Sequence, residues 1–401
     1  MLISQFMMCT NVVLLVSALL LLIVCLFFLI ECTAALLPND QSPNADNCPD
    51  AITILVPAHN EEVVIASTLE KLTPALRKQD RLVVIADNCS DATAQIARAK
   101  GAIVIERHDS NHKGKGYALD YGLQYLESDP PNVVVFVDAD CTVAPNAIET
   151  LTQCAYATGR PVQATYLMVK PKNSNSSKDL VSQFSNIVRN LVRPRGLARL
   201  GQTCPLLGTG MAFPWSVIRK VNVANGHLLE DLKLGLDLTI AGHRPIFCPE
   251  ALVTGDLPQQ LQAARTQRTR WEHGHLQIMQ TYIPMLLFEA VVQKRLDLLV
   301  SILDVCVPPL SLLVVIWLVL MTVSLVFGIL SALWIPADFA ATAGLCFLMA
   351  IITAWAKFAI QDFPLRKLLT IPFYILWKIP VYFKFLVKPQ SVWIRTERNK
   401  I

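Results

Sequence analysis

The chain has 401 residues, of which 53% are hydrophobic and only 16% are charged, and its mean hydropathy is +0.44. Soluble domains are close to half apolar and a quarter charged, so this composition excludes an ordinary soluble protein and favours one attached to a membrane. The formal net charge of +4 is too small to require a nucleic-acid partner, and we expect none.

The first apolar segment lies near the N-terminus. Residues 11–30 carry no charge and are long enough to cross a bilayer as a helix. No Lys or Arg precedes this run, and the run is longer than the apolar part of a usual signal peptide. We therefore predict an uncleaved transmembrane helix within residues 1–37, followed by a polar, proline-rich linker over residues 38–50.

Strand-like and helix-like segments alternate after the linker. Such alternation predicts an α/β domain over residues 51–280, with a mostly parallel sheet and right-handed crossovers. We predict a polar loop over residues 170–179, and from there to about residue 297 we expect helices to carry most of the remaining motifs. The predicted strands lie within residues 51–60, 81–87, 102–108 and 133–137.

Two carboxylates, Asp138 and Asp140, follow the last of these strands directly. If the strand ends near Asp138, both acids lie at the carboxyl edge of the sheet, where open α/β sheets bind ligands. Two carboxylates this close repel each other unless a cation lies between them. The pattern indicates either a divalent-metal clamp on a phosphorylated ligand or a haloacid-dehalogenase-like phosphatase with Asp138 as nucleophile, because residues 138–142 also read D-x-D-x-T. Two solvated turn acids are a third interpretation.

Six further motifs each have an ordinary structural explanation when taken alone. The acids of "HNEE" (59–62) and "DNCSD" (87–91) could cap helices, and Lys115 in "GKGYAL" could be a solvated lysine. The segment "GTG" (208–210) could be a tight turn, and Glu230–Asp231 could simply stabilise a helix N-terminus. The motif "QRTRW" (267–271) could belong to a basic, aromatic helix near the membrane.

The ordered series P-x-x-N-E, D-N-C-S-D, G-K-G-Y-A-L, D-A-D, G-T-G, E-D and Q-x-x-R-W resembles the membrane-bound family 2 glycosyltransferases. Cellulose, chitin, hyaluronan and poly-N-acetylglucosamine synthases belong to that family, as does ceramide glucosyltransferase. The similarity covers about residues 50–275 and the flanking spans. It implies a GT-A fold, which is a Rossmann-like sheet domain, here expected in the cytosol between N- and C-terminal transmembrane helices.

The resemblance implies a binding site for a nucleotide-sugar donor. Asp87 would accept a hydrogen bond from the uracil edge, and Lys115 would place a positive charge near the diphosphate. Asp138 and Asp140 would hold Mg²⁺ or Mn²⁺, which are hard cations that take oxygen ligands, and Asp138 would also contact the donor. The nucleoside pocket would be shaped by Pro57, Asn60 and Glu61.

The resemblance also implies the residues that act on the acceptor. Asp231 would be the catalytic base, removing the proton of the acceptor hydroxyl as its oxygen attacks the anomeric carbon. Trp and Arg side chains suit a sugar face and a diphosphate, respectively. The other substrate-binding residues implied are Gly208, Thr209, Gly210, Glu230, Gln267, Arg270 and Trp271.

The C-terminal third is again apolar. We predict an interfacial helix over residues 281–299, two transmembrane helices within residues 300–360 (300–328 and 338–360), and an interfacial helix with a basic tail over residues 361–401. The interfacial part of that last segment is residues 368–387. The basic residues after the last span place the tail in the cytosol, where it can lie on anionic lipid.

We therefore predict an inverting, metal-dependent glycosyltransferase, multi-pass in the inner or plasma membrane, that uses a cytosolic UDP-linked sugar to extend a polysaccharide. Transfer to a lipid or lipid-linked oligosaccharide is the alternative, since three spans are few for an export channel unless a homo-oligomer or an export partner supplies more. The phosphatase is disfavoured because its motif should end the first strand of the domain rather than the fourth. A non-enzymatic scaffold is disfavoured because no member of the motif series is missing.

Overall fold

The computed structural model describes residues 2–38, 48–170, 176–258, 260–361 and 363–387. They divide into two compact units. The sheet unit comprises Pro38–Asn175 and Gly201–Ile278, and the helical unit comprises Met1–Leu37, Ser176–Leu200 and Met279–Val387. Most of the predicted linker, residues 171–175 of the predicted loop and the basic residues after 387 lie outside the described residues.

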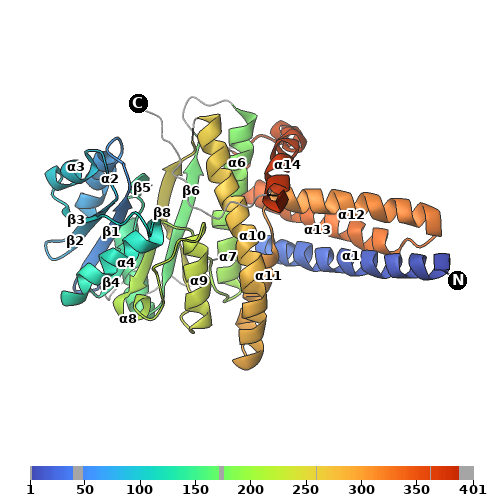
Figure 1. Ribbon diagram of the computed structural model, residues 1–401, viewed down its shortest axis with the longest axis horizontal. Helices are drawn as coiled ribbons and strands as arrows, with labels where there is room; N and C mark the ends of the chain where they lie inside the picture. The colour runs from blue at the N-terminus through green and yellow to red at the C-terminus, as the bar shows by residue number, and fades with distance from the viewer. Residues whose placement is uncertain (1, 39–47, 171–175, 259, 362, 388–401) are drawn as a thin grey trace. The chain divides into compact units, whose positions relative to one another are not determined.

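Within the described residues, eight strands of the sheet unit form one mixed sheet in the order β3-β2-β1-β4-β7-β6-β8-β5 (Figure 1). Strands β1, β2, β3 and β4 are mutually parallel where they pair, and β6 is parallel to β8. Strand β7 is antiparallel to β4 and β6, and β5 is antiparallel to β8. The strands are β1 Ile52–Ala58, β2 Arg81–Asp87, β3 Ile103–Arg107, β4 Val133–Phe136, β5 Cys141–Val143, β6 Val162–Val169, β7 Met211–Pro214 and β8 Ile246–Asp256.

This topology confirms the predicted α/β domain with a largely parallel sheet. Helices α9 (Glu230–Ile240) and α10 (Leu261–Val292) carry the E-D and Q-x-x-R-W motifs, as predicted, but strands β7 and β8 in the same part of the chain were not predicted. Strand β7 has only four residues, and β8 contains Pro249 and Gly255, two residue types that usually indicate turns. Their strand patterns are therefore weak in the sequence.

Helices cover both faces of the sheet because successive strand residues point to opposite sides. On one face, Ile54 and Val56 of β1 share a core with Leu69 of helix α2. On the other face, Leu55 of β1 shares a core with Leu119 of helix α4. The helices of this unit are α2 Ile65–Leu72, α3 Thr93–Ala99, α4 Lys115–Tyr125, α5 Ala147–Thr158, α8 Trp215–Ile218, α9 Glu230–Ile240 and the first part of α10 Leu261–Val292, with short 3₁₀ turns η1 Thr73–Ala75 and η2 Leu126–Ser128.

Strand β4 runs through the middle of the sheet, between β1 and β7. Each residue from Val133 to Val137 is fully buried, as expected for a strand covered on both faces. The strand ends at Phe136, so Asp138 lies just beyond its carboxyl end. The central position of β4 thus places the two predicted metal ligands at the middle of that edge.

The helical unit contains the apolar helices. Among the described residues, three are long and apolar enough to cross a membrane, namely Gln5–Ala34 of α1 (Leu2–Ala34), Leu310–Ser331 (α12) and Ile335–Phe358 (α13). Leu21 and Cys25 of α1 share a small core with Leu313 and Ala343. Figure 1 shows the N-terminus of α1 and the short turn between α12 and α13 at the same end of this three-helix group.

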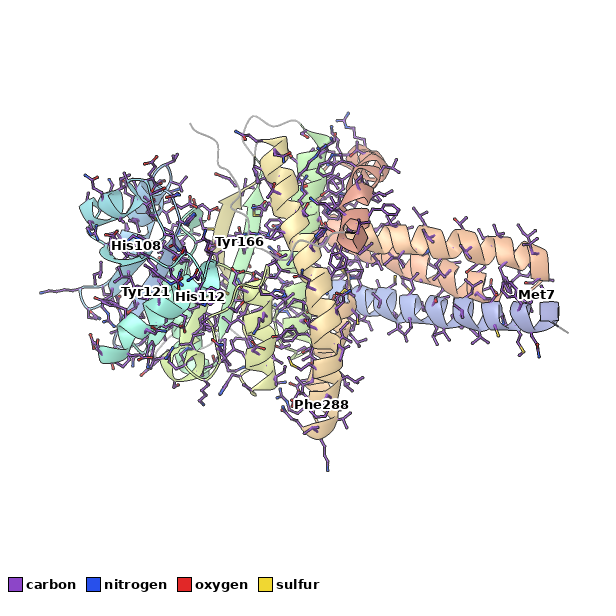
Figure 2. The ribbon with its side chains drawn as sticks, in the orientation of Figure 1. Met7, His108, His112, Tyr121, Tyr166 and Phe288 are labelled. Atoms are coloured by element: carbon purple, nitrogen blue, oxygen red, sulfur yellow. The ribbon has the colours of Figure 1, made fainter. Side chains whose placement is uncertain are left out.

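Several predicted boundaries in this unit differ from the structure. The span predicted over 300–328 begins only at Leu310, because Pro308 and Pro309 separate α12 from helix α11 (Leu296–Cys306). The interfacial helix predicted over 281–299 is the end of the long helix α10 followed by the start of α11. Phe288, near the C-terminal end of α10, is 63% exposed (Figure 2). The remaining segments are α6 Ser177–Ile187, the π-helical turn η3 Val188–Val192, α7 Arg193–Arg199, η4 Leu365–Thr370 and α14 Ile371–Val387.

A buried ion-pair group joins three segments of the helical unit. The guanidinium Nε of Arg193 in α7 donates to Oε2 of Glu31 in α1 at 2.7 Å. Its Nη2 donates to Oδ1 of Asp304 in α11 at 2.6 Å and to the backbone oxygen of the same residue at 2.9 Å. Glu31 is fully buried, so this Arg193 cluster (Glu31, Arg193 and Asp304) neutralises a carboxylate that would otherwise be very costly inside an apolar helix group.

Candidate functional site

Lys115 is the first residue of α4, and its side chain is only 16% exposed. The ammonium Nζ is ion-paired with Oδ1 of Asp138 and donates to the backbone oxygen of Gly208 at 2.5 Å. A Cβ on the next residue, Gly116, would lie 2.6 Å from the backbone oxygen of Asn225, so glycine lets the start of α4 pack closely on that loop. The G-K-G sequence thus holds a lysine facing inward, rather than a solvated lysine.

The turn at residues 208–210 lies directly against the end of β4. Gly208 has a φ of +97°, which favours glycine. Thr209 is fully buried, and its Oγ1 accepts a hydrogen bond from the backbone N–H of Asp138 at 3.1 Å. Gln163 of β6 donates to the backbone oxygen of Thr209 at 3.0 Å and accepts from the N–H of Leu207 at 2.8 Å. Gln163 therefore holds the 208–210 turn in place, and Thr209 of this turn contacts Asp138.

Glu230 and Asp231 open helix α9 and line a pocket together with Lys115. Oδ1 of Asp231 accepts the N–H of Leu232 at 2.8 Å, and its Oδ2 would lie 3.0 Å from a Cβ placed on Gly208. Burial and the neighbouring Asp231 raise the pKa of Glu230 to about 7. Burial alone would lower the pKa of Lys115, but Asp138, Glu230 and Asp231 outweigh it and raise that pKa.

The side chains of Asp138, Asp140 and Cys141 could hold a cation, since one ligand atom from each lies within 4.8 Å of the others. Asp138 is partly exposed and Asp140 is exposed, whereas Cys141 is buried in the core. Burial raises the pKa of Cys141 well above its usual value, and the nearby Asp140 raises it further, so the thiol keeps its proton. The two carboxylates thus fit a hard divalent cation such as Mg²⁺ or Mn²⁺.

The acidic turn after β2 is tied down by its own contacts. Asp87 is 6% exposed, and its Oδ1 accepts a hydrogen bond from Nη1 of the buried Arg107 at 2.7 Å. Asn60, in the turn after β1, accepts the N–H of Ser90 through its Oδ1 at 2.7 Å. Asp91, one residue before the N-cap Ala92 of α3, accepts from the N–H and the Oγ1 of Thr93. Asp91 is therefore engaged with the first residue of α3, whereas Asp87 has an ion-pair partner.

Pro57 and Glu61 belong to the same edge of the sheet. Pro57 is paired with Ile85 across β1 and β2, and the N–H of Glu61 donates to Oγ1 of Thr93 at 2.7 Å. These contacts link the ends of β1 and β2 into one surface, next to β4 in the sheet. The nucleoside role expected for Pro57, Asn60, Glu61 and Asp87 stays a prediction.

Helix α10 brings the "QRTRW" motif to the start of α9. At Gly274 it packs against Leu228 and Leu229, immediately before Glu230. The charge of Arg270 partly offsets the rise that burial causes in the pKa of Glu230, and the Nε of Arg270 is buried without a hydrogen-bond partner among the described residues. Gln267 and Trp271 are partly buried on the same helix, and their roles stay predictions.

The structure thus brings one set of the predicted site residues together around the end of β4. Three further residues were missed by sequence reasoning, namely Gln163, Arg107 and Cys141. Gln163 offers one signal, because a polar residue inside the strand segment "VQATYLMV" needs hydrogen-bond partners when buried. The residues brought together are Lys115, Asp138, Asp140, Gly208, Thr209, Gly210, Glu230, Asp231 and Arg270.

The family model described as "Glycosyltransferase like family 2" matches residues 49–274, which is more than half of the chain. The probable glycosyltransferase YdaM of Bacillus subtilis (strain 168) is 28% identical over 244 residues, covering 58% of this chain and 57% of YdaM. The 4,4'-diaponeurosporenoate glycosyltransferase of Staphylococcus haemolyticus is 28% identical over 204 residues, covering 46% of this chain and 50% of that protein. The chain therefore aligns with only about half the length of these relatives.

A solved structure resembles a larger part of the chain. The mannosyltransferase PcManGT from Pyrobaculum calidifontis, in complex with GDP-Man and Mn²⁺, has a TM-score of 0.56 and 17% sequence identity. The similarity covers 94% of this chain and 100% of that protein. At this identity the likeness supports the fold, and together with the family match it shows that the sheet unit has the GT-A fold.

Proposed function

Because this chain belongs to the glycosyltransferase-like family 2, we propose that it transfers a sugar from a nucleotide-sugar to an acceptor at the membrane, with inversion at the anomeric carbon. The observation that carries the proposal is the convergence of Lys115, two metal-type carboxylates and the Glu230–Asp231 pair at the end of β4. We call Lys115, Asp138, Asp140, Glu230 and Asp231 the donor cluster.

Asp138 and Asp140 are the residues that would hold Mg²⁺ or Mn²⁺. When bound, the metal supplies Lewis-acid stabilisation of the departing diphosphate. The relative with the most extensive structural similarity described above contains GDP-Man and Mn²⁺, which supports a metal-dependent nucleotide-sugar donor for this chain. We propose a UDP-linked sugar, with the base held near Asp87, Pro57, Asn60 and Glu61.

Asp231 is the proposed catalytic base. The N–H of Leu232 fixes one of its oxygens, while the other lies against Gly208 and the pocket. We propose that this second oxygen takes the proton of the acceptor hydroxyl. A single base of this kind, without a covalent intermediate, fits inversion of the transferred sugar.

The three apolar helices support a multi-pass protein of the inner or plasma membrane. We propose that the sheet unit and the chain after α13 face the cytosol, because the segment after the last span is rich in Lys and Arg whereas residues 330–337, between the last two spans, contain neither. The N-terminus and the turn after α12, which share one end of the helix group, would then face the opposite side. A reporter placed at residues 332–334 should read out the non-cytosolic side, and a cytosolic readout there would contradict this topology.

The proposed acceptor is a growing polysaccharide, with Trp271, Gln267 and Arg270 forming part of its platform. A lipid or lipid-linked oligosaccharide acceptor is the second candidate, favoured by the small number of spanning helices among the described residues. Either acceptor would use the same donor cluster, so the product has to be identified directly.

The test incubates membranes containing the protein with a panel of radiolabelled nucleotide-sugars. Labelled product should form with one donor in the presence of Mn²⁺ or Mg²⁺ and not with the Asp231→Asn variant. Size fractionation and lipid extraction then separate a polymer from a single lipid product. Absence of any labelled product that depends on Asp231 would count against the proposal.

A further inference from the structure

The position of the Lys115 ammonium poses a problem for metal binding. It is paired with Asp138, one of the two carboxylates proposed to bind a divalent cation. The backbone oxygen of Gly208 accepts a second hydrogen bond from the same ammonium at 2.5 Å. The positive charge of Lys115 therefore already neutralises one of the two carboxylates that the proposed metal site needs.

The lysine is held in this place by its surroundings. Helix α4 begins at Lys115, and Gly116 packs so closely on the loop around Asn225 that a Cβ would lie 2.6 Å from the backbone oxygen of that residue. The side chain is 16% exposed, so it has little freedom to turn into solvent. Lys115 also lines a pocket together with Glu230 and Asp231, so its ammonium has carboxylates beside it other than Asp138.

We propose that Lys115 and the divalent cation compete for Asp138. When the donor binds, its diphosphate pairs with the Lys115 ammonium and leaves Asp138 to the metal. Without nucleotide, the lysine neutralises Asp138 and keeps metal affinity low. With nucleotide, the anionic diphosphate lies between the ammonium and the metal and attracts both. This inference rests on the proposed function and extends it, because it makes metal and nucleotide binding mutually dependent.

Two consequences follow from linkage. The metal should bind more tightly when the nucleotide is present, and the nucleotide should bind more tightly by the same factor when the metal is present. If Lys115 is the origin of this coupling, removing its charge should change the two affinities in opposite directions. A lysine with a purely structural role would weaken both.

The experiment uses the full-length protein in detergent without nucleotide and measures Mn²⁺ binding from the loss of the free Mn²⁺ electron paramagnetic resonance signal. Lys115→Met should lower the Kd for Mn²⁺ roughly tenfold, because a like charge next to the site is removed. Lys113→Met, two residues earlier and exposed, is the matched control and should leave the Kd unchanged. An unchanged or higher Kd in Lys115→Met would overturn the proposal.

The second arm adds UDP or GDP, which share the diphosphate, at saturating Mn²⁺. Lys115→Met should raise the Kd for the nucleotide roughly tenfold, while Lys113→Met should match the wild type. If the wild type binds neither nucleotide together with Mn²⁺, the proposed function itself fails. If it binds them but Lys115→Met does not tighten Mn²⁺ alone, only the exchange is wrong.

A second variant guards against misfolding. Lys115→Gln keeps most of the side-chain length and should give the same pair of opposite shifts. Thermal melting of both Lys115 variants should stay cooperative. Loss of the cooperative transition in both, with Lys113→Met intact, would show that the lysine is a structural clamp and would overturn the exchange.

Discussion

The donor cluster in the sheet unit and the Arg193 cluster in the helical unit are both built from a cation between carboxylates, but they differ in access. In the Arg193 cluster the side chains of Glu31, Arg193 and Asp304 are 0%, 10% and 15% exposed, and the guanidinium makes three hydrogen bonds. In the donor cluster, Asp138 is 29% exposed and Asp140 is exposed. The first arrangement is closed, whereas the second is open to a ligand.

Arg193 and Lys115 differ in their geometry and in the negative charge that surrounds them. Arg193 presents a planar fork that satisfies two carboxylates at once, which suits a fixed joint between helices. Lys115 is a point charge that faces more negative charge than it can neutralise, since Glu230 and Asp231 also act on it. An excess of carboxylates around a partly open pocket indicates a site that binds further cations, and a buried guanidinium bonded to two carboxylates indicates structure.

The largest expected effect comes from Asp231, the proposed catalytic base. Asp231→Asn keeps the shape of the side chain but cannot take a proton, so turnover should fall roughly 10²–10⁴-fold while nucleotide binding stays near that of the wild type. Asp138→Asn should instead weaken metal-dependent nucleotide binding. Initial rates with the labelled donor and equilibrium binding of the nucleotide, measured on both variants, separate these outcomes. Normal metal-dependent binding by Asp138→Asn would show that this carboxylate is not a metal ligand.

A substitution in the Arg193 cluster should lower the free energy of unfolding. Arg193→Met leaves two carboxylates without their cation, one of them fully buried, and should cost about 3–5 kcal/mol. The lysine-to-methionine change at Lys115 should cost much less, because water reaches the carboxylate left behind. Thermal melting in detergent compares the two variants directly.

Two control experiments test whether the loss of the Arg193 charge causes the loss of stability. Arg195→Met removes a neighbouring arginine that bonds a backbone oxygen of Ala35 rather than a carboxylate, and it should have a smaller effect. Replacing the whole cluster with uncharged residues (Glu31→Gln, Arg193→Met, Asp304→Asn) should recover most of the lost stability. Failure of the triple variant to recover would mean that packing, rather than charge, holds this joint.

Loss of the hydrogen bonds from Gln163 to the 208–210 turn and to Leu207 should have an intermediate effect on stability. Gln163→Leu leaves the N–H of Leu207 and the backbone oxygen of Thr209 without their partner in a fully buried position, which should cost about 1–3 kcal/mol. Turnover should also fall, because the turn contacts Asp138. Gln124→Leu, at an exposed position on α4, is the matched control and should change neither melting temperature nor rate.

The comparison of the two clusters also explains how far sequence reasoning reached. The alternation of strands and helices and the acids after strand ends were enough to predict the α/β domain, the position of Asp138 and the apolar helices. Periodicity is local, so it could not reveal that Arg193 meets Glu31 and Asp304, which are 162 and 111 residues away in the sequence. The same limit hid Gln163, whose partners lie in a turn more than forty residues later.

An effect that depends on pH is expected at Glu230, whose pKa is raised from its usual 4.5 to about 7 by burial and by Asp231. The folded protein therefore holds this proton more tightly than the unfolded chain does. The resulting contribution to stability is fully present below about pH 4.5 and is lost as the pH rises through about 7. Glu230→Gln cannot lose a proton, so this part of the pH dependence should disappear.

Melting temperatures of the metal-free, nucleotide-free protein between pH 5 and 8 test this slope. Glu127→Gln, which replaces an exposed acid paired with Arg219, should keep the wild-type slope. An identical slope in Glu230→Gln would mean that Glu230 is already ionised in the folded protein, and that the donor cluster carries its full negative charge before any donor arrives. That result would sharpen the contrast with the Arg193 cluster, because Lys115 would then face one more fixed negative charge that competes with Asp138 for its ammonium.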